Sequence, residues 1–461
     1  MPDHIKTLSP SLALIHQLEK TQAIVLSKPL HSLDDQSARM EKDPKKGYLF
    51  LFISHDRQFD DLPDIEEVAF TLADGRHYHI PDFRVIGYQA EIKARAPSFA
   101  TDQFNEGLTG YFRYIIALNE EIDFYHTIDH GSTPTDRTNG TRCIRIDFGD
   151  LEMAVYNYSD EAENRFLVLD SQNYCSYKDF SAKEYAVRIA LGYITGKFPS
   201  KEGYCFGYDC PEMIDPQQLR YSQLRPSVDS LYQPMTSNPY IVRDKIVAES
   251  YLGQLRKLSQ VEFARFCKKI DGSVDYLAAI LLIIECSKSS LVVMPACFSV
   301  ALEAMTDLYA ADHKELFHPL PDKATADELK NDLKTVLSAY SERLSPEGRD
   351  ILTAKIDRIN EPTNRTKLMR PFTLLDIPLS KEDIHAVNHR NDFLHGRLNL
   401  NLADDAMIAG KRIYYIALRL YTLLAALILK SIGYDGRIIN HPKFNEEDCE
   451  VKLEEEFFRQ I

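Results

Sequence analysis

The chain has 461 residues, and its 54 Lys and Arg against 69 Asp and Glu give a formal net charge of −15. This length predicts two or three domains, and a content of 44% hydrophobic and 27% charged residues excludes a chain that is mainly disordered. An acidic chain cannot coat nucleic acid with its whole surface, because such binding depends on Lys and Arg that displace counterions from phosphates. Any contact with nucleic acid must therefore be local.

The sequence also indicates where the protein acts. Its eight cysteines are scattered, and several stand in apolar runs, as is typical of reduced thiols. The first 20 residues lack the basic segment and uninterrupted apolar core of a signal peptide. The longest apolar stretch, residues 414–429, contains Arg419 and is shorter than the roughly 20 residues of a membrane span. We therefore expect a soluble, cytoplasmic protein without membrane contact.

Short aromatic and β-branched runs, separated by Gly, Asp, Asn and Pro, dominate the first 175 residues and predict strands. Apolar and polar residues alternate clearly in 142–148, as in a strand with one buried face. Because no helical pattern separates most of these runs, an antiparallel sheet or sandwich is favoured over alternating βα units. The predicted strands are 48–54, 68–72, 78–83, 111–118, 143–148, 153–158 and 165–169.

A helix is predicted over 182–195, because Ser181 and Glu184 have the spacing of a capping box and Gly196 ends the apolar stripe. The segment 198–239 is rich in Pro, Gly, Ser, Tyr and Asp and predicts the domain connection, with one strand near 204–208.

Apolar residues follow a helical period from residue 241 onward. Pro295 is expected to end or kink the second of the helices predicted there, and the acidic tail from Asn445 is expected to be solvated. The helices are predicted over 242–270, 276–292, 298–311, 326–341, 384–393 and 406–432.

These patterns predict an α+β multidomain protein. A β-rich antiparallel N-terminal domain (1–197) is followed by a connecting segment (198–239) and an all-α bundle (240–435). An acidic C-terminal tail (436–461) completes the chain.

One constellation in the helical half could carry chemistry. Arg390 and His395 stand five positions apart, a spacing that composition alone would produce about once, so that it is weak by itself. Its context is more specific: Arg390 is followed by the polar Asn391, then by the apolar pair Phe393 and Leu394, and then by His395 and a glycine. The segment lies in a short predicted helix just before the longest apolar helix.

This arrangement resembles the catalytic motif of the HEPN superfamily, in which an Arg and a polar residue precede a His by four to six residues. The position behind a β-rich domain, together with the segment 299–305 that contains Glu303, resembles the ApeA subset of bacterial anti-phage HEPN proteins. The resemblance implies an endoribonuclease that acts as a homodimer through its helical domain. It also implies a role in abortive infection, with the β-rich domain as a regulatory sensor of a phage-derived trigger.

The chemistry of such a site follows from the residue types. Cleavage of RNA without a metal needs a base for the 2′-hydroxyl proton, an acid for the leaving oxygen and a cation near the phosphate. His395 can fill the first two roles and Arg390 the third. Asn391 and His395 share one helix face, so that the amide can orient the imidazole. Arg390 is offset by about 140° from His395, and two copies facing each other would complete the site.

Further residues could support this site. Glu303 could form a hydrogen bond with the motif, and a local basic cluster could hold RNA phosphates. The substrate is expected to be RNA, possibly tRNA or another structured RNA, and neither a cofactor nor a metal is expected. The basic cluster comprises Arg365, Lys367, Arg370 and Arg397.

A bland interpretation stands beside this one. Arg390 could be a surface cation and His395 a helix-terminal residue favoured by the helix dipole. The chain would then be a non-catalytic HEPN-like module for dimerisation, toxin neutralisation or RNA binding. The pairs His77 with His79, and His126 with His130, lack an obvious further ligand set and therefore predict no zinc site.

Overall fold

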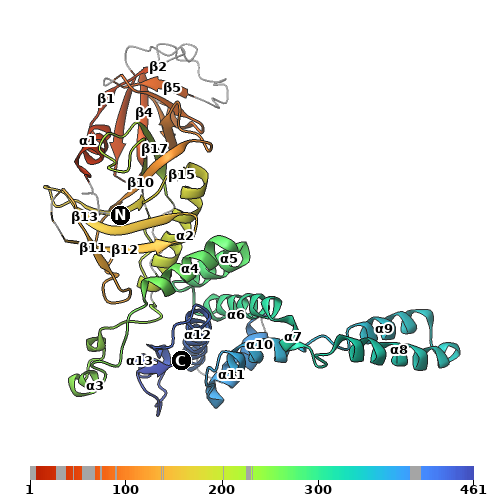
Figure 1. The fold of residues 1–461 in the computed structure, drawn as a ribbon. Helices are drawn as coiled ribbons and strands as arrows, with labels where there is room; N and C mark the ends of the chain where they lie inside the picture. Colours follow the sequence, from red (N-terminus) through yellow and green to blue (C-terminus); the bar gives the residue numbers. More distant parts are fainter. Residues whose placement is uncertain are drawn as a thin grey trace. The chain divides into compact units, whose positions relative to one another are not determined.

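The computed structural model describes residues 7–26, 38–44, 46–53, 68–72, 75–88, 91–136, 138, 140–200, 202–224, 230, 232–394 and 406–461. The chain divides into two compact units (Figure 1), one of residues 1–230 with 257–272 and one of residues 231–256 with 273–461. The first contains a large antiparallel β-sheet region and the second is mainly helical. The α+β class is thereby confirmed.

The first unit contains two antiparallel sheets. One has the order β1–β3–β4–β8–β7, and the other runs β11–β12–β13–β14–β10–β16–β17–β9–β6–β5–β2, with β15 paired to β10. The smaller sheet consists of β1 (Gln22–Ala23), β3 (Arg39–Asp43), β4 (Gly47–Ile53), β7 (Arg84–Tyr88) and β8 (Glu91–Ala96). The larger sheet consists of β2 (Val25–Leu26), β5 (Val68–Thr71), β6 (His77–Ile80), β9 (Ser98–Thr101), β10 (Thr109–Leu118), β11 (Gly131–Thr133), β12 (Thr141–Asp147), β13 (Glu152–Ser159), β14 (Arg165–Ser171), β15 (Cys175–Ser176), β16 (Glu202–Tyr208) and β17 (Gln218–Gln223).

Aromatic side chains from both sheets form the core of this unit. Tyr48 of β4 contacts Phe99 and Tyr221 edge to face, with ring centroids 5.2 and 4.7 Å apart. Phe50 contacts Phe70 in the same way at 5.2 Å. These rings bury a large apolar area, which explains the aromatic and β-branched runs of the predicted strands.

Two long helices also belong to the first unit. α2 (Tyr177–Thr195) begins five residues before the predicted start, because Ser176 rather than Ser181 caps it by accepting a hydrogen bond from the Asp179 amide. α4 (Gln260–Gly272) packs on α2 and β12. The shorter α1 (Ser9–Leu18) packs on the aromatic core through its buried face. Since β16 and β17 pair within the sheet, the expected connection 198–239 is largely part of this unit.

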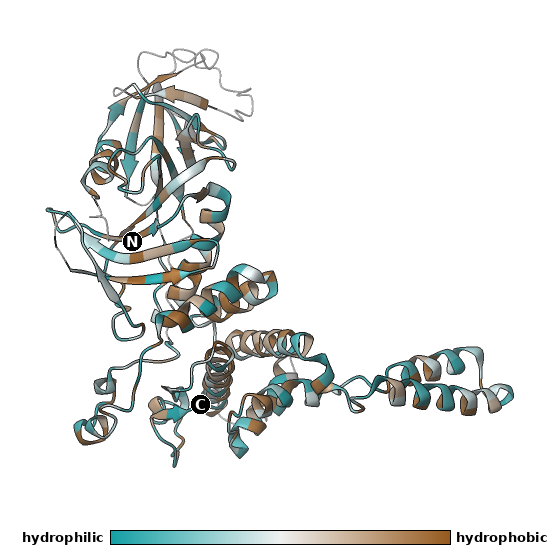
Figure 2. Ribbon diagram, in the orientation of Figure 1, coloured by the Kyte–Doolittle hydropathy of each residue, from teal (hydrophilic) through white to brown (hydrophobic). Residues whose placement is uncertain are grey.

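The helices of the second unit differ widely in burial. Figure 2, which colours each residue by hydropathy, shows both hydrophobic and hydrophilic helical segments in this unit. Its elements are η2 (Pro239–Ile241), α3 (Lys245–Ser250), α5 (Val274–Cys286), α6 (Val293–Asp312), α7 (Lys314–Phe317), α8 (Lys323–Ala339), η3 (Ser341–Arg343), α9 (Pro346–Asp357), α10 (Asn364–Leu374), α11 (Lys381–Leu394), α12 (Ala406–Ser431), β18 (Arg437–Ile439), α13 (His441–Phe444) and β19 (Phe458–Gln460).

The single helix predicted over 242–270 is wrong, because the segment forms two separate helices, α3 and the larger part of α4. Gly253 adopts a φ of 76°, which is left-handed and stops a helix. Ser259 and Glu262 then form a capping box that starts α4, with the Ser259 amide donating to Glu262 at 2.8 Å. Pro295 neither ends nor kinks α5, which stops at Cys286; it lies in the first turn of α6, where its missing amide costs little.

α12 is the core helix of the second unit. The helix over residues 407–431 is long and apolar enough to cross a membrane, but most of it is buried inside the protein. It packs on α6 and α11, and most of its side chains are buried between the other elements of this unit.

The C-terminal tail is not a solvated segment. β19 pairs with β18, and the side chains of Cys449, Phe458 and Ile461 are buried. Glu455 and Glu456 of the tail form ion pairs with the buried Arg419 and the half-buried Arg437, which a count of sequence charges does not reveal.

Candidate functional site

The helix that carries Arg390, α11, is fixed at its first turn. Pro378 follows α10, and Ser380 forms a capping box with Asp383. The Ser380 amide donates to the Asp383 carboxylate at 2.9 Å, and the Asp383 amide donates to the Ser380 hydroxyl at 3.1 Å. These bonds satisfy amides that a helix start leaves without partners, and they set where α11 begins.

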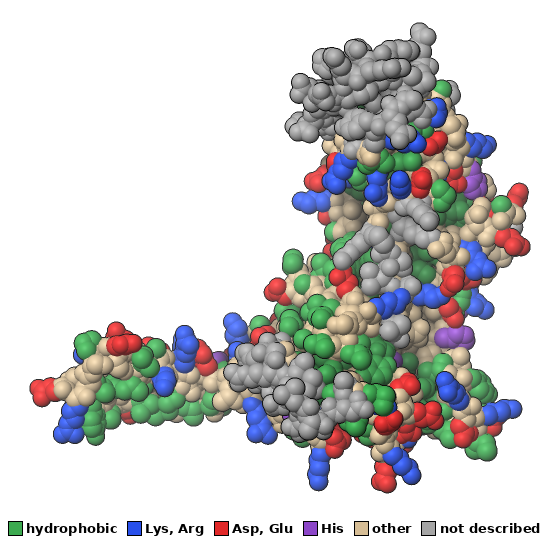
Figure 3. All heavy atoms as spheres, turned by 180° about the vertical axis from the view of Figure 1, so that it is seen from behind, with side chains coloured by type: hydrophobic (Ala, Val, Ile, Leu, Met, Phe, Trp, Pro, Cys, Tyr) green, Lys and Arg blue, Asp and Glu red, His purple; other side chains and the backbone are tan. Residues whose placement is uncertain are grey.

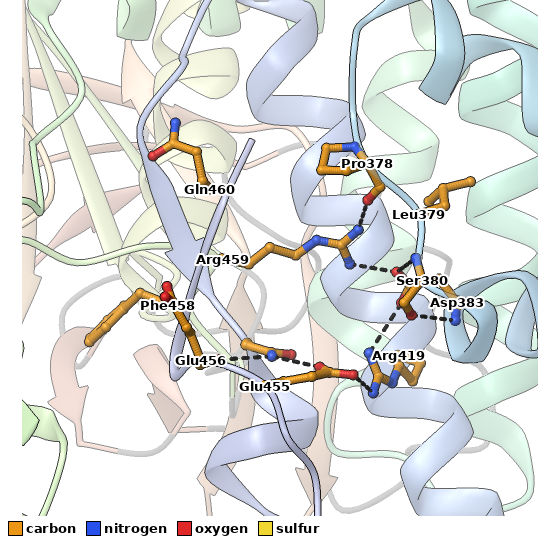
Figure 4. A pocket seen from close by; sticks show the side chains of 11 residues that line it. Pro378, Leu379, Ser380, Asp383, Arg419, Glu455, Glu456, Phe458, Arg459 and Gln460 are labelled. Atoms are coloured by element: carbon orange, nitrogen blue, oxygen red, sulfur yellow. Dashed lines mark hydrogen bonds and ion pairs between the residues drawn. The ribbon is translucent and has the colours of Figure 1, made fainter.

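Asp383 also ties α11 to the rest of the unit (Figure 4). Its buried carboxylate forms ion pairs with Arg419 of α12 at 3.2 Å and with Arg459 of β19 at 2.8 Å. Burial opposes the charge of Arg419, but a hydrogen bond to Glu455 and the Asp383 charge raise its pKa above the ordinary value. The tail thus holds α11 in place beside a cavity of about 390 Å³.

Arg390 lies two turns further along α11 and is buried, with 5% of its surface exposed. Its Nη2 donates to Glu303 Oε1 of α6 at 2.9 Å. α11 packs on α6, which is why these residues meet although they are 87 positions apart. Glu303 is partly exposed, so that one side of this ion pair is open to solvent.

The ion pair lines a small polar pocket of about 150 Å³. Lys367 of α10 enters this pocket and lies 3.9 Å from Asp307 of α6. Thr306, Asn364 and Leu368 complete the lining. The first turn of α10, capped by Thr363, therefore faces the same pocket as Arg390.

Two cations and two carboxylates share this pocket, so that its formal charges balance. A phosphate that enters would compete with Glu303 for the Arg390 guanidinium, which offers planar, charge-assisted hydrogen bonds. An anion can therefore bind to Arg390 only when Glu303 gives up part of its contact with the guanidinium.

The structure brings together some of the predicted site residues. Arg390, Glu303 and Lys367 meet at the pocket, whereas Arg365 and Arg370 are exposed on α10 and do not line it. The backbone of Asn391 continues α11, but its side chain lies outside the described residues. His395 and Arg397 also lie outside the described residues.

Sequence reasoning missed Thr306, Asp307 and Asn364. Asp307 is four residues after Glu303, and Lys367 is three after Asn364, spacings that put each pair on one helix face. This periodicity could have indicated two polar faces. It could not show that α6 and α10 place them together.

Among the described residues, no group of three or more His, Cys, Asp or Glu side chains is arranged to hold a metal ion. No family model, no characterised protein and no solved structure matches this chain.

Proposed function

We propose that the protein is a metal-independent endoribonuclease of HEPN type that acts in the cytoplasm as an abortive-infection effector against phage. The observation that carries the proposal is the buried Arg390, which pairs with Glu303 in the lining of a polar pocket that Lys367 also lines. A buried guanidinium beside a second cation in a small pocket suits the phosphate of an RNA backbone.

The proposed reaction divides its tasks among three residues. His395 takes the proton of the 2′-hydroxyl and returns a proton to the leaving 5′-oxygen, so that a 2′,3′-cyclic phosphate and a 5′-hydroxyl form. Arg390 stabilises the negative charge that develops on the phosphate. Asn391 orients the imidazole, and Lys367 holds the backbone. Two copies supply the residues of one composite site.

Cleavage of RNA by the purified protein in the presence of a chelator tests this proposal. We expect products with 2′,3′-cyclic phosphate and 5′-hydroxyl ends, and a loss of at least about a hundredfold in rate for Arg390→Ala. Arg243→Ala, which removes an exposed Arg of the same unit, is the control and should cleave normally. Cleavage that appears only with added metal, or an undiminished rate for Arg390→Ala, would refute the proposal.

The alternative is a non-catalytic module, and one observation favours it. An Arg390 that is buried and paired with Glu303 could simply join α11 to α6. In that case neither wild type nor Arg390→Ala would cut RNA, and Arg390→Ala would unfold at a lower temperature than wild type. Thermal unfolding of the same two variants separates these outcomes.

A further inference from the structure

The second unit has another surface, on α8 and α9, that the proposed cleavage does not use. α8 and α9 form an antiparallel hairpin, which we call the arm and define as residues 321–360. α8 packs on α9, and within these two fully described helices only Ala326 is buried. The arm nevertheless exposes six large apolar side chains by between 36% and 56%: Leu329, Val336, Tyr340, Ile351, Leu352 and Ile359.

These side chains lie on one face of the arm. Ala326, Leu329, Leu333, Val336 and Tyr340 recur at alternating spacings of three and four, as in a helix that packs lengthwise on another helix. At about 100° per residue, the exposed apolar residues of α8 lie about 40–80° to one side of its buried residue, Ala326. Those of α9 lie about 40–140° from the half-buried Ile356, in the same rotational sense. Since the helices are antiparallel, both displacements point to the same side. Figure 3 shows hydrophobic side chains along one edge of the arm.

Hydrogen bonds join the two ends of the arm, and an ion pair links its helices. The Asn360 side chain accepts a hydrogen bond from the Leu320 amide at 2.8 Å and donates one to the Leu320 carbonyl at 3.0 Å. His318 Nδ1 lies 2.8 Å from the Asn360 carbonyl oxygen, and Lys334 of α8 pairs with Asp357 of α9 at 2.6 Å. These contacts join both ends of the arm and fix its helices to each other. The apolar face is therefore presented as one rigid surface.

We propose that this face pairs with the arm of a second copy of the chain, so that two arms form a four-helix bundle. The arm contains eight acidic and seven basic residues, a net charge of −1 in a chain of −15, and two arms do not repel each other. Its apolar side chains offer on the order of 500 Å² per copy, so that a symmetric pair that covered all of them would bury about 1,000 Å², the lower limit for a specific interface. This pairing goes beyond the proposed cleavage and does not rest on it.

Charge complementation tests the pairing on the full-length chain. The double variant Val336→Lys with Ile351→Lys and the double variant Val336→Glu with Ile351→Glu place like charges on the facing arms. Sedimentation velocity over a concentration series measures the dimer dissociation constant. Asn331→Lys, an exposed change on the opposite side of α8, is the charge-matched control. Circular dichroism verifies that each variant keeps its helices.

We expect a wild-type dimer, a dissociation constant at least about tenfold weaker for each double variant alone, and recovery of the dimer when the two are mixed. The Asn331→Lys control should match the wild type. A monomeric wild type, an unchanged dimer in both double variants, or variants that dissociate without recovering on mixing would each overturn arm-to-arm pairing. A monomeric wild type would also contradict the two-copy site of the proposed function, whereas an unchanged dimer in both double variants would overturn arm-to-arm pairing alone.

Discussion

At the residue scale, the contact between Arg390 and Glu303 determines how readily an anion can bind in the pocket. Glu303 neutralises the guanidinium on which the proposed chemistry depends, and it also holds that guanidinium at the pocket. A carboxylate in this place does two things that substitution can separate, because glutamine keeps the hydrogen-bonding oxygen and removes the charge.

We predict that Glu303→Gln lowers the KM for RNA by about threefold, since Arg390 stays in place while its competing anion is gone. Glu303→Ala should instead lower kcat, because the guanidinium loses its support. Steady-state cleavage kinetics measure both values, with Glu315→Gln on α7 as an exposed control. Equal effects of Gln and Ala would contradict the separate roles of charge and position.

His441 provides a pH-dependent contribution to stability. It is buried against Tyr232 and Tyr421, its Nε2 lies 2.7 Å from the Gln233 carbonyl oxygen, and burial lowers its pKa from 6.5 to about 4. The unfolded chain thus binds a proton at pH 5 that the folded chain does not. His441 therefore leaves the free energy of unfolding unchanged above about pH 6.5, and lowers it progressively as the pH falls from 6.5 toward 4.

We predict that His441 makes the helical unit less stable by about 2 kcal/mol at pH 5 than at pH 7. Urea unfolding of wild type and His441→Gln at both values isolates this contribution, because Gln can still donate to Gln233 but does not titrate. If both proteins lose the same stability between the two values, His441 is not the cause.

At the element scale, α11 depends on the tail that the sequence suggested was solvated. Asp383 joins the start of α11 to Arg419 and Arg459, so that the placement of Arg390 depends on residues at the end of the chain. The fixed start of this helix is a condition for any role of the pocket.

We predict that Asp383→Asn lowers the free energy of unfolding by about 3–5 kcal/mol, because it leaves the buried Arg419 and the half-buried Arg459 without their full countercharge. Cleavage should fall with it as α11 loosens. Asp435→Asn removes an exposed ion pair with Arg256 and should cost less than about 1 kcal/mol. Similar unfolding midpoints for the two variants would contradict the anchoring role of Asp383.

Element types were easier to predict than element ends. The strand near 143–148 and the helix near 406–432 were predicted correctly, because their periodicity is long and regular. The break between α3 and α4 was missed because apolar residues continue across Gly253. Glu303 was singled out from a resemblance, and its contact with Arg390 depends on helix packing that local sequence does not encode.

At the scale of the whole molecule, the two units are not two consecutive segments. The chain enters the helical unit at residue 231, returns to the β-rich unit for 257–272, and then completes the helical unit. The composition of the sequence predicts a single boundary between Phe198 and Pro239. It gives no sign that residues 257–272 belong to the β-rich unit. The β-rich unit therefore includes α4, which packs on α2, and a fragment that ends at residue 197 lacks this helix and two strands.

RNA cleavage in cells during phage challenge tests whether the protein is a ribonuclease that acts on infection. Wild type and His395→Ala are compared at equal expression, with cleaved RNA ends mapped by sequencing. We expect new 5′-hydroxyl RNA ends on infection with the wild type and none above background with His395→Ala. Equal cleavage by both proteins, or cleavage by neither while the wild type still protects the cells, would contradict this expectation.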